Sequence, residues 1–111
     1  MAINSKKKGA QGEREFSKWL FNNLQQYSAR RGIQFSGSAD SPDVTHDIHG
    51  IHFEVKRVER LNLEQAMKQA IKDSEGRSVP VVAHRKNRGD WHMTIRADDL
   101  SEFVNNLFRW V

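Results

Sequence analysis

The chain contains no cysteine, only two prolines and no long hydrophobic run. The lack of cysteine excludes a disulfide framework, a thiolate zinc site and a cysteine nucleophile, so any metal would be held by oxygen or imidazole ligands. The apolar stretches are too short for a membrane span or a secretory signal. We therefore expect a protein that works in a cytoplasm, away from membranes.

What the chain does contain is an excess of basic residues. Its 111 residues carry 18 Lys and Arg against 14 Asp and Glu, a formal net charge of +4, and 37% are hydrophobic. This content suffices for one small folded domain, which we place at residues 9–111, behind a flexible basic arm at residues 1–8. The positive charge gathers in residues 6–31 and 85–88, and such clusters favour a partner with a phosphate backbone.

The periodicity of the apolar residues predicts helices and strands in the order α-β-β-β-α-β-β-α. The expected helices are 10–30, 61–75 and a last one capped by Asp98; the expected strands are a short one from residue 33, then 44–48, 51–55, 79–84 and 91–95. Residues 44–48 and 51–55 flank a tight His49-Gly50 turn and so predict a hairpin. Pro80 indicates that its strand lies at a sheet edge or starts late. The expected fold class is α/β, with a mixed central sheet of about five strands flanked by helices.

The predicted hairpin gathers polar side chains on one of its faces. Opposed residues of a hairpin share a face, so one face is mostly apolar and the other carries Asp43, Thr45, Asp47, His52, Glu54 and Lys56. Asp43 and Glu54 would be diagonal neighbours, roughly 7–8 Å apart at the backbone, so both carboxylates can reach one ion. Mg²⁺ there would activate a water molecule and neutralise a phosphate. Lys56 would orient or deprotonate that water, or stabilise the pentavalent phosphate. The alternative is a solvated face on which Asp43 pairs with Lys56.

Glu13 is a second carboxylate in an unusual place. It shares a helical stripe with Phe16, Leu20 and Leu24, the face that must pack on a core. A carboxylate there needs a cation or a hydrogen-bond partner. The alternative is that Glu13 offsets the dipole of its helix.

Several segments together resemble one known family of nucleases. Pro42-Asp43, ten intervening residues and Glu54-Val55-Lys56 resemble the PD-(D/E)xK signature of the restriction-endonuclease-like superfamily. The segment from Gly9 to Phe16, with Glu13-Arg14-Glu15 inside it, resembles the opening of archaeal Holliday junction resolvases and related phage endonucleases. Ser36-Gly37-Ser38 is similar to their Gly-Ser-rich loop, and the strand pair 79–84 and 90–95 is similar to that of small phage-type members.

This resemblance implies a restriction-endonuclease-like core and a Mg²⁺-dependent endodeoxyribonuclease, in which Mn²⁺ would substitute for Mg²⁺. Asp43, Glu54, the backbone carbonyl of Val55 and Glu13 would hold the metal, and Lys56 would be the catalytic lysine beside Glu13, Asp43 and Glu54. The first expectation for the substrate is a Holliday junction, in DNA recombination; the alternatives are a phage-type endonuclease on duplex or single-stranded DNA, in the host cytoplasm, and a non-catalytic basic DNA-binding module. Symmetric cutting calls for two sites, so we expect a homodimer.

The remaining candidates concern contacts with DNA and with a second copy. The expected DNA contacts, some from charge and some from the resemblance, are Lys6, Lys7, Lys8, Arg14, Ser36, Ser38, Arg57, Arg60, Gln69, Arg85, Lys86 and Arg88. We expect the five histidines to be structural or surface residues, with His52 alone facing the site. The aromatic C-terminus, with Phe108 and Trp110, would pack within the chain or form a dimer interface.

Overall fold

The computed structural model describes the backbone of residues 5–31 and 50–110 and the side chains of residues 9–23 and 50–109. These residues belong to two compact units, of which one contains α1 and the other contains all remaining helices and strands. Each unit is described by itself. The expectation of a single domain over residues 9–111 stays a prediction.

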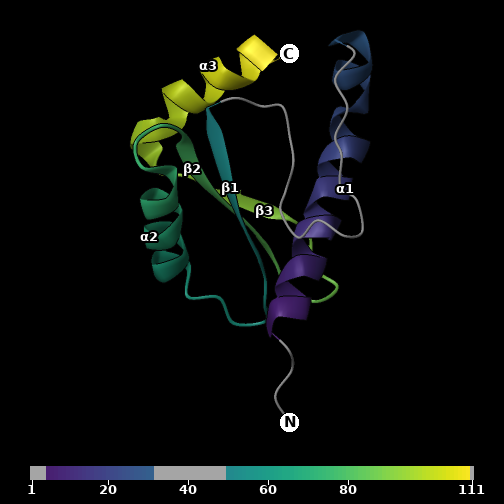
Figure 1. Ribbon diagram of the computed structural model, residues 1–111, viewed down its shortest axis with the longest axis vertical. Helices are drawn as coiled ribbons and strands as arrows, with labels where there is room; N and C mark the ends of the chain where they lie inside the picture. The colour runs from purple at the N-terminus through teal and green to yellow at the C-terminus, as the bar shows by residue number, and fades with distance from the viewer. Residues whose placement is uncertain (1–4, 32–49, 111) are drawn as a thin grey trace. The chain divides into compact units, whose positions relative to one another are not determined.

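Helix α1, Ser5–Arg31, forms the first unit (Figure 1). It begins before residue 10, the predicted start, so residues 5–8 of the expected arm are helical; three consecutive lysines are good helix formers and nothing there breaks the helix. Phe16 and Leu20, four residues apart, are buried. The ring of Trp19 stacks on that of Phe16, with centroids 5.8 Å apart. The predicted apolar stripe is therefore confirmed for its described part.

The second unit contains a three-stranded mixed sheet in the order β1-β2-β3. Strand β1 (Ile51–Arg57) pairs in parallel with β2 (Val79–Arg85), and β2 pairs antiparallel with β3 (His92–Thr94). The predicted strands at 51–55, 79–84 and 91–95 are confirmed. The other two expected strands and the hairpin turn at His49 lie outside the described residues. What is shown is a small α/β fold in the order α-β-α-β-β-α.

The prediction drawn from Pro80 is wrong, because β2 starts at Val79 and is central among the described strands. The geometry of the ladder explains why proline fits there. The Val79 amide donates to the Gly50 carbonyl at the start of β1, 2.7 Å away, so the nitrogen of the next residue points away from β1. On that side β3 extends only as far as Thr94, opposite Val82, and no described strand needs a donor from Pro80.

Helix α2, Leu63–Ser74, lies against the sheet of the second unit (Figure 1). Asn62 caps its start by accepting the Gln65 amide at 3.1 Å, and Glu75 ends it with a φ of 48°, just before Gly76. Its buried residues are Ala66, Ala70 and Ser74, whereas the larger and more hydrophobic Leu63 is exposed. Small side chains allow α2 to lie close to the sheet, where Ala66 and Ala70 pack on Val82.

The last helix, α3 (Leu100–Trp110), follows a 3₁₀ turn at Ala97–Asp99. Asp98 lies inside that turn, so the prediction that it caps the helix is wrong; the ion pair between Arg96 and Asp99, 2.7 Å long, fixes the turn instead. Asn106 is buried and donates through Nδ2 to the Gly50 carbonyl at 3.0 Å. Among the described residues, no helix is both long enough and apolar enough to cross a bilayer.

Candidate functional site

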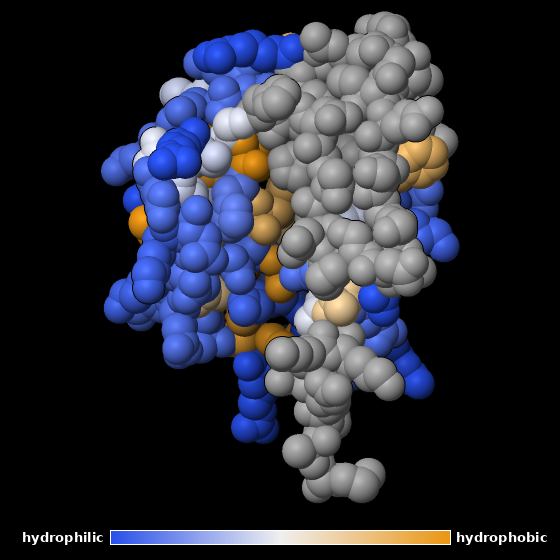
Figure 2. Space-filling model, in the orientation of Figure 1, coloured by the Kyte–Doolittle hydropathy of each residue, from blue (hydrophilic) through white to orange (hydrophobic). Residues whose placement is uncertain are grey.

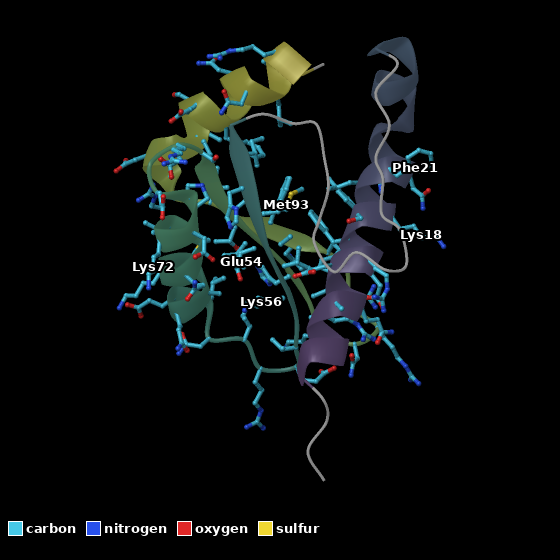
Figure 3. All side chains as sticks on the ribbon, viewed as in Figure 1. Lys18, Phe21, Glu54, Lys56, Lys72 and Met93 are labelled. Atoms are coloured by element: carbon cyan, nitrogen blue, oxygen red, sulfur yellow. The ribbon has the colours of Figure 1, made fainter. Side chains whose placement is uncertain are left out.

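Three polar side chains of β1 share the face of the sheet that α2 covers. His52, Glu54 and Lys56 alternate along the strand and so point to one side. Glu54 is the register partner of Val82, and partners in neighbouring strands share a face. Because Val82 packs against α2, the three polar side chains face α2 as well. Figure 3 shows Glu54 and Lys56 between β1 and α2.

Glu54 lies between two basic groups. Its Oε2 is 3.5 Å from His52 Nε2, and its Oε1 is 3.6 Å from Lys56 Nζ. The Glu54 side chain is 19% exposed, against 32% for His52 and 37% for Lys56. A carboxylate with so little access to water needs compensating charge, and Lys56 supplies a positive charge beside it.

Helix α2 adds a second carboxylate, Asp73, from its last turn. One ligand atom each of His52, Glu54 and Asp73 lies within 4.8 Å of the others. Gln69, one turn earlier, donates Nε2 to both oxygens of Asp73, each at 3.0 Å. Sequence reasoning missed Asp73. Its position three residues after Ala70, on the same side of the helix, was the available signal.

The direction of the Val55 carbonyl follows from the pairing of β1 with β2. The Gly50 carbonyl and the Val58 amide both bond to β2, and in a parallel ladder alternate residues point to the same neighbour. Even-numbered residues of β1 therefore bond to β2. The carbonyl of Val55, the expected backbone ligand, points to the opposite edge of the strand.

The other predicted members of the site divide into two groups. Glu13 lies in α1 and is partly buried, but α1 belongs to the other unit, so its place relative to Glu54 is not described. Asp43, Ser36 and Ser38 lie outside the described residues. Of the four residues expected to be catalytic, the structure brings together Glu54 and Lys56.

Basic side chains gather where β1 and β2 end. Arg57 and Arg85, the last residues of these strands, are register partners. The following loops are joined because the Asn87 amide donates to Glu59 Oε1 at 2.8 Å. Five expected DNA contacts therefore share one end of the sheet, and we call them the basic rim: Arg57, Arg60, Arg85, Lys86 and Arg88. Of the other candidates, Arg14 lies on α1, Gln69 bonds to Asp73, and the side chains of Lys6, Lys7 and Lys8 lie outside the described residues.

A pocket of about 330 Å³ lies beside the basic rim. His84 and His92 line it, and their rings stack with centroids 5.6 Å apart. His84 Nε2 is 3.0 Å from Thr94 Oγ1. Burial, and next the positive charge of His92, lower the pKa of His84 below its usual value. Because His84 is the register partner of Lys56, this pocket opens on the same sheet face as Glu54.

The arrangement combines two carboxylates, an imidazole and an ammonium group, next to a basic rim. Such a set can hold a divalent cation, orient a water molecule and stabilise negative charge on a phosphate. In comparisons with protein-family models, curated proteins and solved structures, no match to this chain was found.

Proposed function

We propose that the protein is a metal-dependent DNA endonuclease that hydrolyses phosphodiester bonds. The single observation that carries the proposal is the contact between Glu54 and Lys56 on a strand whose neighbouring helix adds a third polar group, Asp73. A surface ion pair alone would be unremarkable. Here the carboxylate is largely shielded from water, and the pair stands at the Glu-x-Lys positions of the PD-(D/E)xK pattern that the sequence resembles.

The residues present fit a bound divalent cation. Glu54 would supply a carboxylate oxygen, and Val55 a carbonyl that points away from β2; Asp43 and Glu13 are proposed as the further ligands. Mg²⁺, or Mn²⁺ in its place, would lower the pKa of a bound water and so supply the nucleophile. Lys56 would hold that water or its proton, and its charge would stabilise the pentavalent phosphate.

The basic rim supports DNA as the substrate. It gathers five cationic side chains, and the two segments that carry them, residues 57–60 and 85–90, contain two carboxylates, Glu59 and Asp90. It begins at Arg57, one residue after Lys56, and strands rise about 3.3 Å per residue. A DNA backbone held at this end of the sheet would therefore lie roughly 10 Å along the strand from Glu54, three residues before Arg57. We propose a branched junction as the first substrate class, and a duplex or single strand as the second.

A second copy of the chain is the proposed partner. Phe108 is 74% exposed, so packing within the chain, one of the two alternatives for the aromatic C-terminus, does not account for this side chain. Leu100 and Val104 precede it at helical spacing and are also exposed. A twofold contact through this stripe would give the two sites that symmetric cutting requires. Sedimentation of the protein as a monomer at micromolar concentration would contradict it.

The test is incubation of the purified protein with labelled four-way junction, duplex and single-stranded DNA, each with Mg²⁺, Mn²⁺ or EDTA. We expect metal-dependent cutting, lost in Glu54→Gln and Lys56→Ala, while binding to DNA in EDTA stays close to wild type. Glu64→Gln and Lys68→Ala are matched controls, because these residues form an exposed pair 3.8 Å apart on α2; both should cut normally.

Each outcome of this experiment decides between classes of function. If no substrate is cut with either metal, the endonuclease proposal is wrong, and retained DNA binding would then identify the non-catalytic binding module. If cutting occurs but survives in both Glu54→Gln and Lys56→Ala, the protein is a nuclease whose site lies elsewhere.

A further inference from the structure

One ring nitrogen of His52, Nε2, lies in an unusual environment beside Glu54. Nε2 is shielded from water and, among the described residues, has no hydrogen-bond partner, although Glu54 Oε2 lies only 3.5 Å away. A buried polar atom without a partner costs about 1–3 kcal/mol. An imidazole nitrogen and a carboxylate oxygen 3.5 Å apart, with no hydrogen bond between them, have the spacing of two ligands on one metal ion.

Asp73 is positioned as a further ligand. It comes from a different element than His52 and Glu54, yet its carboxylate lies within 4.8 Å of both. Ligand atoms bonded to one tetrahedral ion at roughly 2.1 Å lie about 3.4 Å apart. His52 Nε2 and Glu54 Oε2, 3.5 Å apart, already have this spacing, and the Asp73 carboxylate, within 4.8 Å of both, needs to move closer by roughly 1 Å.

Gln69 acts on this site through Asp73. Its amide nitrogen donates to both carboxylate oxygens at 3.0 Å, which fixes the direction in which Asp73 points. Metal-binding carboxylates commonly have such hydrogen-bonded partners, whose loss weakens metal binding about 10–100-fold. Gln69 is a positioning residue of the site, in place of the direct DNA contact expected from sequence.

We propose that His52, Glu54 and Asp73 bind a first-row transition-metal dication of the Mn²⁺, Co²⁺ or Zn²⁺ class in preference to Mg²⁺. Mg²⁺ favours oxygen ligands and retains several waters, whereas an imidazole nitrogen favours transition metals. Three protein ligands leave open positions for water or a phosphate oxygen. Lys56 contacts Glu54 Oε1, which leaves Oε2, the oxygen nearer His52, for the ion.

The cation site shares Glu54 with the proposed nuclease site but does not depend on DNA cleavage. If the protein cuts DNA but binds no transition metal at these residues, only the cation-site proposal is wrong. If it binds the metal but cuts no DNA, only the endonuclease proposal is wrong.

The experiment measures Co²⁺ binding to the full chain, without DNA, by visible absorption and calorimetry, with Mg²⁺ as competitor. We expect wild type to bind Co²⁺ at least tenfold more tightly than Mg²⁺ and to show a nitrogen-ligated Co²⁺ spectrum. His52→Ala and Asp73→Asn should each weaken Co²⁺ binding tenfold or more. Gln69→Ala should weaken it roughly tenfold while keeping the nitrogen-ligated spectrum.

His92→Ala and Asp98→Asn serve as controls, because they remove an exposed imidazole and an exposed carboxylate elsewhere in the same unit; neither should change Co²⁺ affinity. Circular dichroism of each metal-free variant shows whether it folds, and Asp73→Asn, which keeps the side-chain shape, tests the site if His52→Ala unfolds. Equal affinity for Co²⁺ and Mg²⁺, or affinity unchanged in both His52→Ala and Asp73→Asn, would overturn the proposal.

Discussion

Gly50 should be one of the least replaceable residues in the unit that bears the site. It precedes β1, the strand of His52, Glu54 and Lys56, and has a φ of +81°. Its carbonyl accepts two hydrogen bonds, from the Val79 amide and from Asn106 Nδ2. A Cβ added at Gly50 would lie 2.5 Å from Asn106 Nδ2 and 2.9 Å from Asn106 Cγ. Alanine therefore meets two obstacles at once: the backbone conformation and the Asn106 side chain.

The size of the effect follows from these two obstacles. Holding alanine in the left-handed region costs roughly 1–2 kcal/mol, and displacing Asn106 from its hydrogen bond costs about 0.5–1.5 kcal/mol more. The smaller entropy of an unfolded chain with alanine returns about 0.4–1 kcal/mol. We expect Gly50→Ala to lower the free energy of unfolding by about 2 kcal/mol, or the melting temperature by roughly 8 °C for a domain of this size.

Gly76→Ala is the matched control. Gly76 has a similar φ of +71°, but no atom lies within 4 Å of the added Cβ, so this variant has only the backbone penalty and should lose less than about 1 kcal/mol. Urea unfolding of both variants measures the difference. In an Asn106→Ala background, Gly50→Ala should lower the free energy of unfolding by no more than Gly76→Ala does. The coupling energy between positions 50 and 106 is then about 1 kcal/mol. If Gly50→Ala costs the same with and without Asn106, the steric argument is refuted.

Two further predictions concern the basic rim and the paired histidines. Fluorescence anisotropy in EDTA measures how the affinity for duplex DNA falls with salt, and the double variant Lys86→Ala/Arg88→Ala should reduce the slope of log affinity against log salt by about 2. Arg77→Ala, which removes an exposed cation beyond the end of α2, should leave the slope unchanged. Equal slopes in wild type and both variants would show that the rim makes no phosphate contacts. The pKa of His84 is lowered from 6.5 in the folded chain, so on acidification the unfolded chain binds a proton at His84 at a higher pH than the folded chain does. The contribution of His84 to the free energy of unfolding should therefore be fully present above pH 6.5 and be lost as the pH falls below that value. His92→Gln should raise the pKa of His84 in an NMR titration and make the acid loss of stability smaller; an unchanged His84 titration would exclude the influence of His92.

The part of the fold that could be predicted from sequence is the part that depends on local pattern. Alternation along residues 51–55 was enough to predict a strand with His52 and Glu54 on one face, and Lys56 follows at the same spacing. The end of α2 was predictable in the same way, from the glycine that follows it. These features depend on residues a few positions apart, and the periods of strands and helices relate such residues directly.

What could not be predicted depends on which elements become neighbours. Hydrophobicity favours Leu63 for the buried face of α2, but Leu63 is exposed. Close packing on Val82 selects the small side chains Ala66 and Ala70, with Met67 packed beside them. The face that packs on the sheet decides where Asp73 points. Asn106 was missed for the same reason, since its partner, Gly50, is 56 residues away.

The contribution of α2 changes how the β1 carboxylate should be understood. On an isolated hairpin, Glu54 beside Lys56 is most simply a solvated ion pair, worth little to stability. The parallel pairing of β1 with β2 requires a crossover between them, and that crossover is α2, which covers the polar face and brings Asp73 to it. Covering the face removes water from Glu54 and gathers a second carboxylate beside it, which raises the repulsion between them. In the proposed cation site, a bound ion would relieve that repulsion and would also contact His52 Nε2, which has no hydrogen-bond partner among the described residues.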